Sequence, residues 1–350
     1  MNVVRCFDMN RRKSLQLLAA AGLMGPAAVL RAATDASVAT VDDLPLISGP
    51  LTLYLGRGEG GLYEDILDAI RKRNPGLDLK VRRGPSSALA NTIVAESGAG
   101  VSRADVFWAI DSGSIGRVVG DAKVRQLPSA IRNLLKTDFR FDAWAPISGR
   151  IRTVPFNTER LTREAVPKSI MALPERDLEV GWAPAYGAFQ SFVTAMRLLN
   201  GEEATKAWLR AMRPKARSYA GEFGVVMAVS RGEIDLGLAN HYYTLRLKKG
   251  RPAAPLDLAF TRNDAGCLLN TSGAVLLSDR PQAKLFVQHL LTREVQSYLS
   301  REAFEIPLVA GIQSPVGLPA ISDIHPPAVD LEKLANLRPT LDLLRETGVL

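Results

Sequence analysis

Three tyrosines stand where the chain leaves predicted β-strands. Tyr186 follows the predicted strand 180–183, and Tyr242 and Tyr243 follow the predicted strand 234–239. Ligands of open parallel sheets bind beyond the carboxyl ends of the strands, so we expect the three phenols to meet. Neighbouring aromatic side chains also serve as ordinary core or interface residues, and that alternative stays open.

Converging phenols favour one kind of ligand, a strongly polarising cation. A free phenol has a pKa of about 10, and it must lose its proton before it binds a metal. Calcium and magnesium prefer carboxylates and carbonyls. Trivalent iron is the better match for hard phenolate oxygens, so the three tyrosines predict a ferric site.

The common catalytic motifs give little support for another chemistry. The three histidines have no partner at metal-ligand spacing, and no G-x-S-x-G, Walker or H-E-x-x-H sequence occurs. Gly56, Gly58 and Gly61 match the dinucleotide-binding spacing, but Arg82 and Arg83 stand where that motif places an acidic residue. An arginine there would also suit a 2′-phosphate. We interpret the glycine loop as the wall of a cleft, and we expect no enzymatic activity.

The elements that must position the tyrosines alternate between strand and helix. Strand-like segments lie at 51–55, 77–81, 104–109, 180–183, 234–239 and 274–277. Helical stretches lie at 62–70, 89–96, 189–199, 202–212 and 282–291. This alternation predicts an α/β fold with largely parallel sheets covered by helices. A chain of 350 residues is long enough for two lobes.

The N-terminus has the pattern of an export signal. Basic residues, including Arg11 and Arg12, precede an apolar run at 15–30, which is too short for a stable membrane span. The arginine pair predicts a twin-arginine signal at 1–33, cut between 33 and 39; an ordinary signal that happens to carry two arginines is the alternative.

Removal of that signal changes the composition of the mature chain. It removes five basic residues and Asp8, which lowers the formal charge from +8 to +4. This mild charge gives no indication of nucleic-acid binding. Cys267 is then the remaining cysteine, so neither an internal disulfide nor a cysteine-rich metal site is expected.

Several sequence blocks resemble one known family across nearly the whole mature chain. The blocks lie at 51–59, 86–91, 104–108, 148–150, 181–190, 232–243 and 272–274. They are similar, in order and spacing, to periplasmic ferric-iron-binding proteins of ABC transporters. The resemblance implies the type II fold of periplasmic binding proteins, with two α/β lobes joined by hinge strands and the ligand between them. Each lobe is then expected to hold a mixed or parallel sheet with flanking helices.

The resemblance also implies boundaries, partners and location. Lobe 1 is expected at 48–150 plus 270–317, and lobe 2 at 151–269 plus 318–350. The expected partner is an ABC transporter permease in the inner membrane, with the protein itself a monomer in the periplasm. The lobes would close over the ligand by hinge bending.

The family's ligand positions can be carried over one at a time. Its paired tyrosines match Tyr242 and Tyr243, and the further tyrosine of some members matches Tyr186. A histidine and a glutamate used by other members correspond to Gly58 and Ile110, so the chain resembles the tyrosine-rich subgroup.

The family often completes its site with carbonate or another small anion. The resemblance implies that Arg150 and Asn240 contact this anion, and the helix start at Gly187 and Ala188 offers backbone N–H groups to it. Glu222 stands where many members have asparagine, and a carboxylate there would repel a phosphate. Arg150 could instead form a simple salt bridge, and Asn240 could simply cap a helix.

Other charged residues are predicted near the cleft without an assigned role. They are Arg57, Glu59, Asp111 and Glu222. Three rival functions stay open: the same fold binding an anionic or phosphorylated organic solute, a periplasmic enzyme that reuses the cleft, and an iron-sensing subunit that docks on a receptor.

Overall fold

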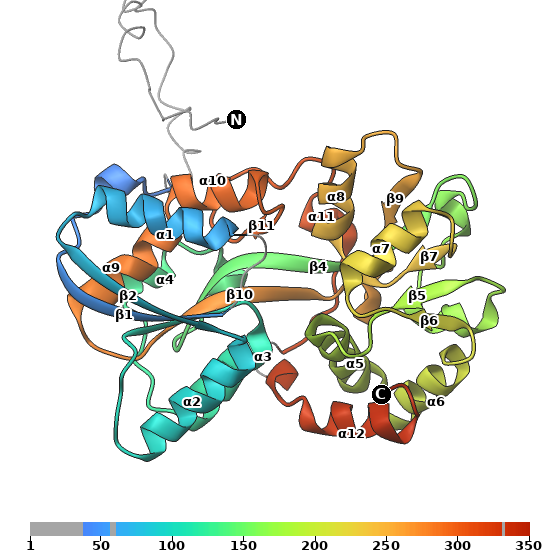
Figure 1. Cartoon of the computed structure of the whole chain (residues 1–350), viewed down its shortest axis with the longest axis horizontal. Coiled ribbons are helices and arrows are strands. Elements are labelled where there is room, and N and C mark those ends of the chain that lie inside the picture. The colour runs from blue at the N-terminus through green and yellow to red at the C-terminus, as the bar shows by residue number, and fades with distance from the viewer. Residues whose placement is uncertain (1–37, 57–60, 331–332) are drawn as a thin grey trace, which may run out of the picture. The chain divides into compact units, whose positions relative to one another are not determined.

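The computed structural model describes residues 38–56, 61–330 and 333–350 of the chain (Figure 1). The predicted signal segment 1–33 lies outside this range, and so do Arg57, Gly58 and Glu59. All the described residues belong to one compact unit.

Strands and helices alternate along most of the described chain. The strands are β1 (Gly49–Gly56), β2 (Leu77–Gly84), β3 (Val106–Ala109), β4 (Ala145–Asn157), β5 (Val180–Trp182), β6 (Ala216–Ser218), β7 (Leu236–Gly237), β8 (Ala239–Asn240), β9 (Leu256–Ala259), β10 (Leu269–Leu276) and β11 (Ile306–Pro307). The first six helices are α1 (Leu62–Arg73), α2 (Ser86–Gly98), α3 (Ser112–Asp121), α4 (Ser129–Arg132), α5 (Gly187–Asn200) and α6 (Glu202–Met212). The others are α7 (Glu222–Ser230), α8 (His241–Gly250), α9 (Pro281–Leu290), α10 (Arg293–Arg301), α11 (Ile321–Ile324) and α12 (Arg338–Glu346).

One group of strands is covered on both faces by helices. β1 pairs in parallel with β2 and β3, and β10 adds antiparallel to β3. Alternate residues of β1 point to opposite faces, as a strand requires: Leu53 and Leu55 enter a core with α1, α9 and α10, whereas Tyr54 enters a core with α2 and α3. Figure 1 shows α1 and α2 on the two sides of these strands.

A second group of strands is organised around β5. β5 pairs in parallel with β6 and β7. Trp182 of β5 packs in a core with Phe189 and Phe192 of α5, Trp208 of α6 and residues of α12. Helices α7 and α8 pack in a separate core, to which α8 contributes Tyr242 and Tyr243.

The long strand β4 belongs to both groups. Its first half pairs antiparallel with β10, with Arg150 opposite Asn270. Its second half pairs antiparallel with β7, β8 and β9, with Arg152 opposite Asn240. β4 therefore runs from one set of strands into the other, as Figure 1 shows.

The predicted α/β class, with mixed sheets and flanking helices, is confirmed; only the largely parallel sheets expected from the strand–helix alternation differ. The sheets are mixed rather than largely parallel, because β10 and β4 run against their neighbours. The sequence interpretation did not place β4. Its two prolines and alternating polar residues are untypical of a buried strand, although it is buried along nearly its whole length. The two predicted lobe ranges stay a prediction.

Candidate functional site

The three tyrosines predicted as ligands lie together. The hydroxyl oxygens of Tyr186 and Tyr243 are 2.8 Å apart, a hydrogen bond in which either oxygen can donate. The ring centroids of Tyr242 and Tyr243 are 4.4 Å apart, with their planes at 47°. Tyr242 and Tyr243 are buried, at 3% and 7% exposure, and Tyr186 is half-buried. Their role as metal ligands stays a prediction.

Strand-to-helix connections bring these side chains to one place. After β5 the chain makes one turn, closed by a hydrogen bond of 3.0 Å from the N–H of Tyr186 to the carbonyl of Ala183, and α5 begins at the next residue. α8 follows β8 directly, so Tyr242 and Tyr243 lie in its first turn. A helix N-terminus carries partial positive charge, which favours ionised oxygen nearby.

Two arginines and an amide surround Tyr242. The guanidinium carbon of Arg246 lies 4.8 Å from the centre of the Tyr242 ring, and that of Arg150 lies 5.9 Å from it. The side-chain nitrogen of Asn240 donates to the Tyr242 hydroxyl at 3.4 Å. Positive charge close to a phenol stabilises its ionised form, so this surrounding suits a phenolate.

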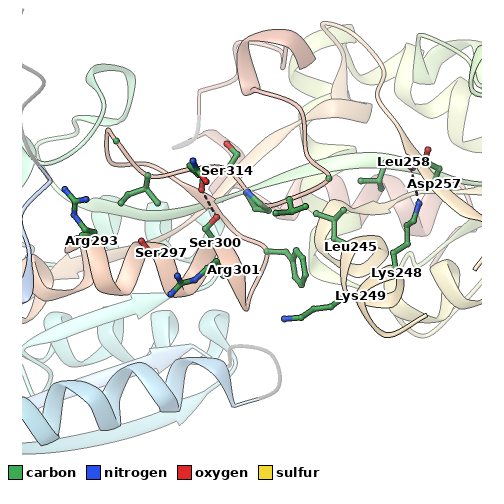
Figure 2. Close-up of a pocket in the computed structure, with 17 residues that line it drawn as sticks. Leu245, Lys248, Lys249, Asp257, Leu258, Arg293, Ser297, Ser300, Arg301 and Ser314 are labelled. Carbon is green, nitrogen blue, oxygen red and sulfur yellow. Dashed lines mark hydrogen bonds and ion pairs between the residues drawn. The ribbon is translucent and has the colours of Figure 1, made fainter. Parts of the chain in front are cut away.

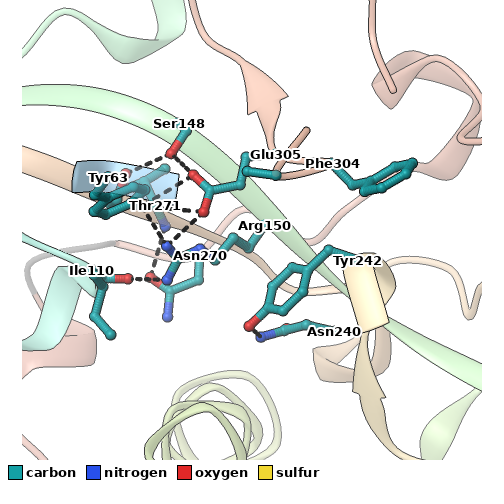
Figure 3. A network of polar contacts seen from close by, with 12 residues as sticks. Tyr63, Ile110, Ser148, Arg150, Asn240, Tyr242, Asn270, Thr271, Phe304 and Glu305 are labelled. Carbon is teal, nitrogen blue, oxygen red and sulfur yellow. Dashed lines mark hydrogen bonds and ion pairs between the residues drawn. The ribbon is translucent and has the colours of Figure 1, made fainter. Parts of the chain in front are cut away.

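Arg150 is held in a network of protein groups (Figure 3). Its Nη2 donates to Glu305 Oε1 at 2.9 Å and to the hydroxyl of Tyr63 at 2.8 Å, and its Nη1 donates to the carbonyl of Ile110. Tyr63 donates in turn to Glu305 at 3.1 Å, and Ser148 also donates to this carboxylate. The side chains of Arg150 and Glu305 are 12% and 5% exposed. Arg150, which was predicted to contact an anion, therefore already pairs with a buried carboxylate.

A second arginine on the same strand has its own carboxylate. Arg152 forms an ion pair with Glu222, and the two side chains are 3% and 0% exposed. The other oxygen of Glu222 accepts the backbone N–H of Asn240 at 2.9 Å. The guanidinium of Arg152 lies 5.2 Å from the ring centre of Phe192, and its Nη2 has no hydrogen-bond partner among the described residues.

His241 connects β4 to the segment after α10. The N–H of Ile151 donates to its Nδ1 at 3.2 Å, and its Nε2 is 2.6 Å from the carbonyl oxygen of Phe304. Burial lowers the pKa of His241 to about 4. A neutral ring with its proton on Nε2 satisfies both contacts, so this histidine is built into the fold by hydrogen bonds.

The other residues predicted to contact an anion are Gly187, Ala188 and Asn240, and they differ in their exposure and hydrogen bonds. Gly187 and Ala188 form the start of α5, and Gly187 is exposed with open space around it. Asn240 is the N-cap residue of α8 but makes no side-chain capping bond. The roles of these residues toward an anion stay predictions.

Asp111 has a structural partner of its own. Its carboxylate accepts the backbone N–H of Ser114 at 2.7 Å and the Ser114 hydroxyl at 3.0 Å, and so caps the start of α3. Burial raises the pKa of Asp111, against the effect of these hydrogen bonds. Its predicted place near the ligand stays untested.

Three residues of this region were missed by the sequence interpretation: Tyr63, Arg152 and Glu305. Tyr63 and Glu305 are brought to β4 from distant segments, so no local spacing reveals them, and Arg152 lies on β4, which the sequence interpretation did not place. One signal was available: Arg150 and Arg152 alternate along an otherwise apolar stretch, and buried arginines need carboxylate partners.

The described residues hold no cluster of the side chains that most often bind metals. Within residues 38–56, 61–330 and 333–350, no three His, Cys, Asp or Glu side chains gather closely enough to hold a metal. No helix in this described part of the chain is long and apolar enough to cross a membrane.

A cavity of about 780 Å³ is a second feature of the structure, and Figure 2 shows the residues that line it. It is lined by the end of α8, by α10 and by the segment 311–317. Its cationic side chains are those of Lys248, Lys249, Arg293 and Arg301. None of the three phenols lines it, so its size alone does not make it the predicted site.

Comparison with known proteins shows the family to which this protein belongs. Residues 51–305 match the family of bacterial extracellular solute-binding proteins. Because the match spans most of the chain, the protein belongs to this family.

Within this comparison, several individual proteins are similar to the chain over most of its length. The chain is 29% identical to the Fe(3+)-binding periplasmic protein of Serratia marcescens, over 93% of this chain and 98% of the relative. It is also 29% identical to the major ferric iron-binding protein of Neisseria meningitidis, over 92% of this chain and 98% of the relative. The crystal structure of iron-bound HitA from Pseudomonas aeruginosa superposes with a TM-score of 0.77 at 28% identity, covering 87% of this chain and all of that one.

Proposed function

We propose that this solute-binding protein captures Fe(III) in the periplasm and delivers it to an ABC transporter permease in the inner membrane. The observation that carries the proposal is the cluster of Tyr186, Tyr242 and Tyr243, with a 2.8 Å distance between two of the hydroxyls. Support for the cargo also comes from the names of its relatives, which are ferric iron-binding proteins.

Charge supports a trivalent ion at this cluster. Three phenolates neutralise Fe(III), and each loses its proton as it binds. Arg246 and Arg150, close to the ring of Tyr242, favour that loss. Tyr242 and Tyr243 are buried, so iron must enter while the surrounding elements are apart, as hinge bending allows.

A small anion at Gly187, Ala188, Arg150 and Asn240 is the second part of the proposal, with carbonate as the leading candidate. It has less support than the phenolates, because Arg150 is already paired with Glu305. No reaction is required for this function: the protein binds and releases its cargo. Export through a twin-arginine signal would place it in the periplasm.

Metal analysis with a visible spectrum of the purified protein tests the proposal. Phenolate bound to Fe(III) gives a charge-transfer band in the visible range, so we expect a coloured protein with about one iron per chain. The variant Tyr243→Phe is the matched sample, because it removes one hydroxyl and keeps the ring. A colourless wild-type protein that takes up no iron from ferric citrate would refute the function.

A further inference from the structure

The cavity of Figure 2 lies between the two groups of strands that β4 joins. One wall consists of the end of α8 and of β9, which pairs with the second half of β4. The other wall is α10, which packs in the core of β1, α1 and α9. The segment 311–317 completes the lining. A volume of about 780 Å³ is in the range of sites that hold small organic molecules.

One face of α10 lines the cavity with polar side chains. The residues on this face are Arg293, Ser297, Ser300 and Arg301. Residues three or four positions apart lie on the same side of a helix, which is why one helix can direct all four to one cavity. The two arginines are exposed, and neither side chain forms an ion pair with another residue in the described part of the chain. Their guanidinium groups are therefore available to an anion.

The opposite wall adds two lysines with partly occupied charges. Lys249 pairs with Glu302 at 3.0 Å, and Lys248 is 3.9 Å from a carboxylate oxygen of Asp257. Asp257 also pairs with Arg163, and it is the acidic residue among the described residues that line the cavity. The lining thus carries four cations and one shared carboxylate, and a cleft lined by one sign of charge concentrates ligands of the opposite sign.

Apolar side chains form the rest of the lining. Leu245, Leu258 and Phe304 are buried against the protein, at 7%, 3% and 8% exposure. Val316, in contrast, is 89% exposed at the same cavity. A ligand with an apolar body would cover Val316 and remove its side chain from water. The combination of apolar lining and a few charged groups is typical of sites for organic molecules rather than for inorganic ions.

Phe304 holds an unusual backbone conformation at this cavity. Its φ of 56° lies in the left-handed region, which bulky residues avoid. Such conformations persist where the surrounding structure fixes them, and they are concentrated at ligand sites. The carbonyl oxygen of Phe304 is 2.6 Å from His241 Nε2, and Figure 3 shows its ring directed away from the Glu305 network. The ring is thereby held at the cavity.

We infer that this cavity is a second ligand site, which binds an organic dianion with an apolar body. The anionic groups pair with Arg293 and Arg301 on one wall and with Lys248 on the other. The apolar body covers Phe304 and Val316. The site is separate from the proposed iron site, because none of the three phenols lines it.

A fluorescent dicarboxylate tests the inference on the iron-free protein. Naphthalene-2,6-dicarboxylate has an apolar ring system with a carboxylate at each end, and its fluorescence reports binding. We expect saturable binding with a dissociation constant below about 100 µM, which weakens as the salt concentration rises. Naphthalene-2,6-dimethanol has the same rings without charge, and it should bind at least tenfold more weakly.

Two variants locate the probe. Arg293→Gln combined with Arg301→Gln removes the cations of α10, and Val316→Asp places a carboxylate beside the ligand. These positions are exposed, so the fold should be kept, and we expect each variant to lose about tenfold or more in affinity. Arg231→Gln combined with Arg345→Gln removes the same charge from exposed ion pairs elsewhere and should bind like the wild type.

Three outcomes would overturn the inference. A wild-type protein without saturable binding up to about 1 mM probe would leave this face to a protein partner. Equal losses in the α10 and control variants would show that net charge alone attracts the probe. Equal binding of the uncharged analogue would remove the need for an anion. Because no measurement uses iron, a protein that binds the probe but no iron would support this site and refute the proposed function alone.

Discussion

The hydroxyl oxygens of Tyr186 and Tyr243 lie 2.8 Å apart, although the residues are 57 positions apart in the chain. A hydrogen bond between two phenols needs a proton on at least one of them. Because a metal ligand must be deprotonated, Fe(III) binding at this point has to remove that proton and break the bond.

Removing single phenol oxygens tests the ligand assignment. We expect Tyr242→Phe and Tyr243→Phe each to weaken iron binding at least tenfold, about 1.4 kcal/mol, because the cation loses one negative oxygen. The Phe ring preserves packing, so the thermal stability of the iron-free protein should change little. Titration with ferric citrate, followed in the visible band, measures the effect.

The control for this series is a buried tyrosine outside the cluster. Tyr54 donates to Glu96 at 2.9 Å and packs in another core, so Tyr54→Phe should leave colour and affinity unchanged. If Tyr186→Phe, Tyr242→Phe and Tyr243→Phe all kept full colour and affinity, these tyrosines would be ordinary core aromatics.

Iron uptake should release protons. With three neutral phenols as the starting state, we expect on the order of three protons per iron, and a steep loss of affinity on acidification. Calorimetry in buffers of different ionisation enthalpy counts the protons. Uptake without proton release would mean that iron binds to groups other than phenols.

The buried pair of Arg150 and Glu305 should be costly to break from one side. Arg150→Met leaves the Glu305 carboxylate buried without its cation, and we expect a loss of about 3–5 kcal/mol in the free energy of unfolding. Adding Glu305→Gln should recover a large part of it. Urea unfolding of the single and double variants gives the coupling; additive losses would show that the two charges act independently.

His241 predicts an acid-sensitive fold. Burial lowers its pKa to about 4 from the ordinary 6.5, with the carboxylate of Glu305 opposing and the cation of Arg150 adding to this shift. The unfolded chain therefore binds the proton more readily than the folded one. Stability should be complete above about pH 6.5 and fall as the pH drops toward 4, by about 1.4 kcal/mol per unit.

The variant His241→Asn isolates this contribution. It cannot take up a proton, so urea unfolding of the iron-free protein at several pH values should show a shallower acid loss than in the wild type. His325→Asn, at an exposed position, is the control. An unchanged pH slope in His241→Asn would assign the acid sensitivity to other groups.

Export gives a test that needs no purified protein. Replacing Arg11 and Arg12 together by lysine should stop export if a twin-arginine signal directs it. Fractionation of cells, followed by blotting of the periplasmic fraction, measures the result. Undiminished periplasmic protein would point to the general secretory route.

Local pattern was enough to predict the elements that carry the phenols. The strands before Tyr186 and before Tyr242 were expected at 180–183 and 234–239, and the structure has β5 at Val180–Trp182 and β7 and β8 within 236–240. These elements combine short apolar runs with a following helix start, which are local signals.

Long-range partners could not be predicted in the same way. Glu305 meets Arg150 across 155 positions, and Glu222 meets Arg152 across 70. Such pairs form because β4 runs between two sets of strands. The spacing of apolar residues along the sequence does not reveal that path. For this reason, the prediction that Arg150 contacts an anion did not include its ion pair with Glu305.

Tyr242 and Tyr243 are consecutive residues in the first turn of α8, so as the proposed iron ligands they would act as a chelate. The covalent chain and the helix hold the two rings 4.4 Å apart, so the second donor is already ordered when the first engages a cation. Less conformational entropy is then lost in forming the second bond than with ligands from separate loops. Tyr186, from another element, would set how tightly the ion is finally held.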